Sequence, residues 1–190
     1  MDEELYKLAL RVGRALRRRD LMLATAESCT GGWIGQAVTM VPGSSEWFER
    51  GFVTYTYISK REMLGVKGAS LAREGAVSEQ VVREMALGAL KKSHAQMSVA
   101  VSGVAGPGGG TPDKPVGTVC FAWARKPGKA VVETRRFRGD RDQVRRRTVV
   151  HALRGVLSLI GDQGIRAFGG IRPRATNSAS GRQRAGSRMG

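Results

Sequence analysis

Cysteine is almost absent from this sequence of 190 residues. Cys29 and Cys120 are the only two, which excludes a disulfide framework and a zinc site made from cysteine alone. No apolar run approaches the roughly 18–20 residues that a membrane-spanning helix needs. The N-terminus opens with acidic residues and then alternates charged with apolar positions, which is not typical of a secretory signal. We therefore expect a soluble, cytoplasmic protein of a reducing compartment, with no membrane contact.

Acidic residues are also scarce relative to basic ones. The chain has 32 Lys and Arg against 16 Asp and Glu, a net charge of +16. Residues 163–190 are rich in arginine, contain no acid and have few large apolar side chains, so we expect a disordered basic tail. This tail is either a solvated extension or a weak, salt-dependent contact for nucleic acid. Aromatic side chains that would stack on bases hardly interleave with the arginines, since only Phe137 and Phe168 lie among them.

The remaining residues, 1–162, predict a single three-layer α/β/α domain with a mixed sheet. Apolar periodicity predicts helices over residues 2–19, 33–41, 79–92 and 140–160. Runs rich in β-branched and apolar residues predict strands at 21–25, 51–58, 97–103, 117–125 and 130–138, the last two forming a hairpin. A short helix capped by Ser44 or Ser45 and running through Phe48, and a helical turn at 60–64, complete the expected elements. Strands that alternate with helices are typical of an α/β domain.

Ser28 lies between a predicted strand and a predicted helix, beside the pair Gly31-Gly32. Free backbone N–H groups at a helix N-terminus stabilise negative charge, so this place suits a serine nucleophile with an oxyanion site. The alternative is that Ser28 or Thr30 only caps the helix while the glycines allow a tight turn. Cys29 is a second candidate nucleophile, because a helix N-terminus lowers the pKa of a thiol.

A serine nucleophile needs a base, and neither His94 nor His151 is well placed for this role in the sequence. A lysine can replace histidine, because burial disfavours the ammonium form and lowers its pKa toward neutrality. Lys60, just after the predicted strand 51–58 that contains Tyr55, is the best candidate. The alternative is an ordinary solvated surface lysine.

The glycine-rich stretch 101–118 follows a predicted buried strand. Its backbone can approach a phosphate or an acyl oxygen closely, although it lacks the Lys-Ser/Thr ending of a P-loop and is equally compatible with a structural loop. Further along, Arg141 and Arg145 share one helix face at i and i+4. They could hold an anionic ligand or form ion pairs with Asp140 and Asp142. Acids and histidines do not cluster, so we expect no metal site.

Together these segments resemble the CinA C-terminal domain family. The motifs AESCTGG, GSSEWFERGFVTYTYISKREMLGV, SVAVSGVAGPGGGTPDKPVGTV and FRGDRDQVRRRTVVHAL follow the family pattern in order and spacing over about residues 3–160. The resemblance implies a CinA C-terminal-like fold. It also implies hydrolysis of the carboxamide of nicotinamide mononucleotide to nicotinate mononucleotide and ammonia, in pyridine nucleotide salvage and without a metal or organic cofactor.

The resemblance also implies roles for single residues. Ser28 matches the nucleophile and Lys60 the base, with Tyr55 nearby in the catalytic pocket. Lys60 or Tyr55 is expected to protonate the departing ammonia. The arginines are expected to bind the substrate phosphate or to contact another subunit of a homodimer or larger homo-oligomer. Tyr57 and Ile58 depart from the smaller or polar residues expected there. The substrate-binding residues carried over are Cys29, Thr30, Gly31, Gly32, Ser102, Gly103, Gly106, Arg141 and Arg145.

A second reading is a non-catalytic module that binds nucleic acid or a DNA-processing partner. The charge of +16 and the association of the family with competence and DNA damage suggest it. Phosphate binding needs exposed basic residues, whereas Ser28, Tyr55, Lys60 and Ser102 are predicted at strand ends beside glycine turns. The position of these isolated polar residues favours the enzyme.

Overall fold

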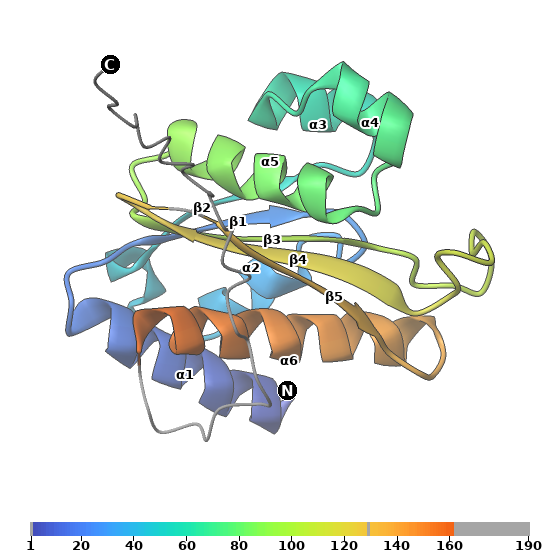
Figure 1. The fold of residues 1–190 in the computed structure, drawn as a ribbon. Coiled ribbons are helices and arrows are strands. Elements are labelled where there is room, and N and C mark those ends of the chain that lie inside the picture. Colours follow the sequence, from blue (N-terminus) through green and yellow to red (C-terminus); the bar gives the residue numbers. More distant parts are fainter. Residues whose placement is uncertain (1, 129, 162–190) are drawn as a thin grey trace, which may run out of the picture.

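Five strands form one mixed sheet at the centre of the molecule (Figure 1). The computed structural model describes residues 2–128 and 130–161, so the predicted disordered tail lies outside the described residues. In spatial order the strands are β2 (Phe48–Val53), β1 (Leu23–Glu27), β3 (Met97–Gly103), β4 (Thr118–Arg125) and β5 (Val131–Arg136). Strands β2 and β3 flank β1 and run parallel to it, while β4 is antiparallel to both β3 and β5.

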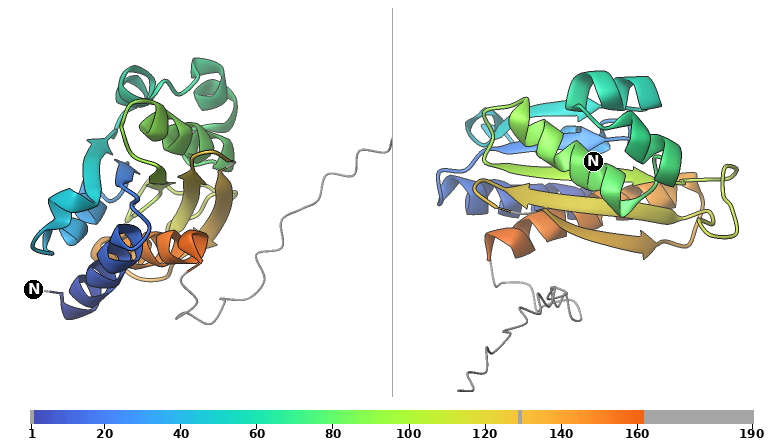
Figure 2. Two further views of the ribbon diagram at one scale, coloured as in Figure 1. Left: turned by 90° about the vertical axis from the view of Figure 1, so that its left-hand side faces the viewer. Right: turned by 45° about the horizontal axis from the view of Figure 1, so that its top comes forward.

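Helices cover both faces of this sheet, as the end-on view in Figure 2 shows. One layer contains α1 (Glu3–Arg17), α2 (Trp33–Thr39) and α6 (Arg141–Ile160). The other contains α3 (Tyr57–Leu64), α4 (Gly68–Glu74) and α5 (Glu79–Lys91). The buried apolar side chains form one cluster on each side of the sheet. The predicted three-layer α/β/α architecture with a mixed sheet and a hairpin, formed by β4 and β5, is therefore confirmed.

The parallel strands bring their carboxyl ends to one edge of the sheet. Glu27, the last residue of β1, pairs with Val53 of β2 on one side and with Val101 of β3 on the other. All five residues of β1 are buried, which is typical of a parallel strand covered by helices on both faces. The turn after β1, the start of α3 and the glycine-rich loop after β3 consequently meet at this edge, on the right in Figure 1.

Two local predictions were wrong, and one helix was missed. The strand expected over 51–58 ends at Val53, because Thr56 and Ser59 form a reciprocal capping box that starts α3 at Tyr57. The short 3-10 helix η1 (Ser44–Glu46) follows Gly43 without a side-chain cap, and Phe48 belongs to β2. Helix α4 was not predicted.

None of the helices in the described part of the chain combines the length and apolar character that a bilayer crossing requires.

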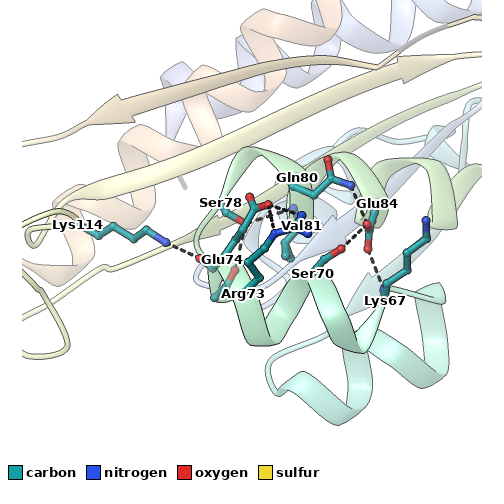
Figure 3. Close-up of polar contacts among 10 residues, drawn as sticks. Lys67, Ser70, Arg73, Glu74, Ser78, Gln80, Val81, Glu84 and Lys114 are labelled. Atoms are coloured by element: carbon teal, nitrogen blue, oxygen red, sulfur yellow. Dashed lines mark hydrogen bonds and ion pairs between the residues drawn. The ribbon is translucent and has the colours of Figure 1, made fainter.

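Polar contacts attach α4 to α5 (Figure 3). The Glu84 carboxylate on α5 accepts hydrogen bonds from the Ser70 hydroxyl at 2.7 Å and from the Lys67 backbone N–H at 2.8 Å. Lys114 of the glycine-rich loop donates to the Glu74 carbonyl oxygen at the end of α4 (Figure 3). These contacts join the helical layer that carries α3 to the loop after β3.

Helix α3 approaches α5 closely at Gly88. A Cβ atom at this position would lie 2.0 Å from the Leu64 carbonyl oxygen, at the end of α3. Only glycine allows the two helices to lie this close, and the contact sets the height of α3 above the sheet.

We predict that Gly88→Ala lowers the free energy of unfolding by about 1–3 kcal/mol, because the overlap with Leu64 outweighs the better helix propensity of alanine. Gly68→Ala is the control, since a Cβ at Gly68 meets only Arg61 at ordinary contact distance. Urea unfolding of both variants measures the difference. Equal stability of the two variants would contradict the prediction.

Candidate active site

Ser28 and Lys60 are 32 positions apart in the chain and in contact in the fold. The Lys60 Nζ atom lies 3.0 Å from Ser28 Oγ and 2.7 Å from the Thr54 carbonyl oxygen. Lys60 is on the first turn of α3 and its side chain reaches the end of β1. It is fully buried, so the alternative of a solvated surface lysine is wrong.

Burial changes the acid–base character of this lysine. It lowers the pKa of Lys60 from 10.5 to about 8, because the ammonium ion loses hydration that the protein replaces only in part. A substantial fraction of neutral amine is therefore present near pH 8. Such an amine next to a hydroxyl can accept its proton, which is the arrangement that a serine nucleophile needs.

The turn after β1, residues 28–32, is called the Ser28 turn below. Its last two residues, Gly31 and Gly32, have φ of 63° and 96°, a left-handed conformation that strongly favours glycine. Gly32 is the residue that precedes α2, and it has no side chain to cap the helix. Neither Ser28 nor Thr30 caps α2, so the proposed hydroxyl cap is wrong, whereas the two glycines do allow the tight turn.

The Glu27 carboxylate, and not a Ser28 or Thr30 hydroxyl, accepts from the backbone N–H groups at the start of α2. This carboxylate is 2% exposed and accepts hydrogen bonds from five groups. The donors are Thr25 Oγ1 at 3.4 Å, Thr30 Oγ1 at 2.6 Å, and the backbone N–H groups of Gly32, Ile34 and Gly35 at 3.1, 2.9 and 2.8 Å. The sequence reasoning missed Glu27. The available signal was a single acid at the end of an apolar strand, four positions before Gly31-Gly32.

The structure corrects two expectations for the Ser28 turn, the identity of the oxyanion donors and the pKa of Cys29. The N–H groups of Gly31 and Gly32 are engaged with the Ser28 carbonyl and the Glu27 carboxylate, so within the turn only those of Cys29 and Thr30 remain as candidate oxyanion donors. Second, burial raises the pKa of Cys29 to about 12, with a smaller contribution from the Glu27 charge. The thiol is therefore protonated at neutral pH, and a lowered pKa at the helix N-terminus is not found.

Arg141 connects Tyr55 to the glycine-rich loop. Its guanidinium donates to the Gly106 carbonyl at 2.7 Å and to the Tyr55 hydroxyl at 3.1 Å. Tyr55 is 59% exposed, and its carbonyl oxygen lies 3.5 Å from Lys60 Nζ. These residues come from the start of α6, from the segment before α3 and from the loop after β3. Arg141 and Tyr55, which are both exposed, form a basic and aromatic rim near Lys60.

Arg145 faces the Ser28 turn. It donates to the carbonyl oxygens of Cys29 at 3.2 Å and Thr30 at 3.0 Å, and its guanidinium lies 5.1 Å from the centre of the Trp33 ring. Its third nitrogen forms the expected ion pair with Asp142 at 3.3 Å. The other expected partner, Asp140, caps α6 by accepting from the Gln143 backbone N–H. The guanidinium thus holds the turn from the α6 side.

Ser102 and Gly103 end strand β3 at the same edge. Ser102 is 1% exposed and pairs with Cys120 of β4 in the register. A Cβ on Gly103 would lie 2.7 Å from a Val119 methyl group and 2.8 Å from the Thr118 carbonyl oxygen, so this glycine permits the close approach of β4. Among residues 2–128 and 130–161, no three His, Cys, Asp or Glu side chains come together as a metal site would require.

The protein-family model for the CinA C-terminal domain matches residues 5–160 of this chain. The chain belongs to the CinA C-terminal domain family. Nicotinamide-nucleotide amidohydrolase PncC of Escherichia coli K12 is 53% identical over 152 residues, which are 80% of this chain and 92% of that one. PncC of Pseudomonas putida is also 53% identical, over 80% of this chain and 94% of its own length.

A solved CinA-family structure agrees with the fold. The competence/damage inducible protein CihA of Agrobacterium tumefaciens superposes with a TM-score of 0.82 at 44% identity. The superposition covers 84% of this chain and 97% of that one. The family and the fold expected from the motifs are therefore confirmed.

The lowered pKa of Lys60 predicts a pH-dependent stability difference between the protein and Lys60→Met. The folded pKa of about 8 lies below the unfolded value of 10.5, so the unfolded chain binds more protons between these values. Stability then rises with pH through this window, by about 3 kcal/mol at most for this group. Urea unfolding from pH 7 to 10.5 should show that the free energy of unfolding of the wild type increases relative to that of Lys60→Met. The exposed Lys7→Met is the control and should show no such gain.

Proposed function

We propose that this protein hydrolyses the carboxamide of nicotinamide mononucleotide to nicotinate mononucleotide and ammonia, with Ser28 as nucleophile and Lys60 as base. The observation that carries the proposal is the 3.0 Å contact between the Ser28 hydroxyl and the buried Lys60 amine. The names of the PncC relatives, at 53% identity over most of both chains, support the substrate. Such a reaction belongs to pyridine nucleotide salvage.

The acylation half of the reaction follows from this pair. The neutral Lys60 amine removes the Ser28 proton while Ser28 Oγ forms a bond to the amide carbon. The N–H groups of Cys29 and Thr30 are the proposed donors to the oxyanion, and in comparable sites the loss of one such donor costs roughly 3 kcal/mol. The Lys60 ammonium then returns its proton to the leaving nitrogen. The C–N bond breaks, ammonia departs, and the acyl group remains as an ester on Ser28.

Deacylation uses the same groups in reverse. Lys60, neutral again, accepts a proton from water while the water oxygen attacks the ester carbon. The ester bond breaks, Ser28 Oγ recovers a proton from Lys60, and the carboxylic acid product leaves and loses its remaining proton to solvent as it becomes the carboxylate. We assign Tyr55 to the pocket wall next to this exchange.

The substrate also carries a phosphate and a cationic pyridinium ring. We assign the phosphate to Arg141, whose guanidinium lies on the exposed rim between Tyr55 and Gly106. Guanidinium groups bind phosphate through paired N–H donors. The ends of β3 and its loop, at Ser102, Gly103 and Gly106, would complete the wall opposite Tyr55.

Ser28→Ala should reduce ammonia release from nicotinamide mononucleotide to background, because no other group at the end of β1 replaces the hydroxyl. The fold should survive, since Ser28 Oγ makes its contact with Lys60 alone among the contacts described. Ser93→Ala, which removes a hydroxyl at the far end of α5, should keep full activity. Full activity of Ser28→Ala would overturn the proposal. Loss of that activity in Ser28→Ala/Cys29→Ala would then assign the nucleophile to Cys29.

The rate should rise with pH and level off above about pH 8. Below this value Lys60 is increasingly protonated and cannot accept the Ser28 proton. The measurement is kcat between pH 6 and 9.5 at saturating substrate. Lys60→Arg stays charged throughout this range and should be inactive at every pH. A flat wild-type profile, or an active Lys60→Arg variant, would contradict the assigned base.

A further inference from the structure

Glu27 lies directly before Ser28 but belongs to neither the rim nor the Ser28–Lys60 pair. Its carboxylate points into the N-terminus of α2 and accepts from the Thr30 hydroxyl and three backbone N–H groups of the turn and helix. A buried carboxylate with this many donors is expensive to displace. It therefore anchors the C-terminal side of the Ser28 turn.

The main chain of Glu27 anchors the other partner. Its carbonyl oxygen accepts from the Thr54 backbone N–H at 2.8 Å, and the Thr54 carbonyl in turn accepts from Lys60 Nζ at 2.7 Å. The Ser28 backbone N–H donates to the Val101 carbonyl of β3 at 3.1 Å. One residue thus joins the backbone that supports the amine to the turn that carries the hydroxyl.

We propose that Glu27 is a positioning residue that holds Ser28 at hydrogen-bond distance from Lys60. The inference rests on the proposed function of Ser28 as nucleophile. A displacement of about 1 Å between reacting groups can cost on the order of 100-fold in rate. Loss of the Glu27 contacts should therefore reduce kcat far more than it changes the binding of substrate.

The role requires a carboxylate and not its amide. Oε1 accepts from the Gly35 N–H, and Oε2 accepts from the N–H groups of Gly32 and Ile34. In Glu27→Gln the NH₂ group must replace one of these oxygens, and it then faces an N–H donor. The variant keeps the size of the side chain but loses at least one anchor.

The experiment measures kcat and KM for ammonia release from nicotinamide mononucleotide in Glu27→Gln, Thr30→Val and Thr30→Ser. We expect kcat to fall at least 30-fold in Glu27→Gln, with KM changed less than 3-fold. Thr30→Val removes one hydrogen bond to Glu27 and should lower kcat by a smaller factor, again with little change in KM. Thr30→Ser keeps the hydroxyl and should have a higher kcat than Thr30→Val. Rates are divided by the folded fraction from near-UV circular dichroism. If Glu27→Gln does not fold, the comparison of kcat between Thr30→Val and Thr30→Ser tests the inference.

Ser78→Ala is the matched control for the loss of a helix cap. The Ser78 hydroxyl accepts from the Val81 N–H at the start of α5 (Figure 3), on the other layer of the molecule. This variant should lose about 2–4 °C in Tm and keep its kcat.

Two results would overturn the inference. One is a Glu27→Gln variant, or a Thr30→Val variant where Glu27→Gln is unfolded, with wild-type kcat per folded molecule. The other is a loss that lies entirely in KM. Either result with an inactive Ser28→Ala refutes only the role of Glu27. An active Ser28→Ala refutes the proposed nucleophile instead.

Discussion

The burial of one amine against one hydroxyl is the contact on which the site depends. Lys60 is fully buried, and the loss of hydration that brings its pKa to about 8 is unfavourable for the charged form. The Thr54 and Tyr55 carbonyl oxygens offset this cost in part, because they accept from the same amine that contacts Ser28. The fold therefore contains a buried group that lowers its stability, and under the proposed function the reactivity of Ser28 is the consequence.

Parallel strand pairing makes this contact possible. The paired ends of β2, β1 and β3 place the residues that follow them at one edge, and α3 then turns back over the sheet. Gly88 allows α3 to lie directly on α5, which brings the side chain of Lys60 down to the end of β1. Two segments 32 residues apart thus meet without any local sequence signal that relates them.

Charge is used differently from what the composition suggests. The arginines at the start of α6 suggested anion binding, yet Arg145 is turned inward and donates to the carbonyls of the Ser28 turn. The N-terminus of α2, expected to stabilise an oxyanion, is filled by Glu27. In both places the chain satisfies its own charged or polar groups first, because burial without partners is unfavourable.

Periodicity and turn residues were sufficient for most helices, for the hairpin and for the three-layer class, since these depend on neighbours within a few positions. Ser28 and Lys60 were paired through the resemblance to the family motifs, because no local pattern relates two positions 32 residues apart. The start of α3 at Tyr57 was missed because a reciprocal cap between Thr56 and Ser59 outweighed the β-branched run. The partners of Glu27, the thiol pKa of Cys29 and the direction of Arg145 emerged only with the assembled molecule. Burial and long-range hydrogen bonds depend on which segments the sheet brings together, and local pattern does not contain that information.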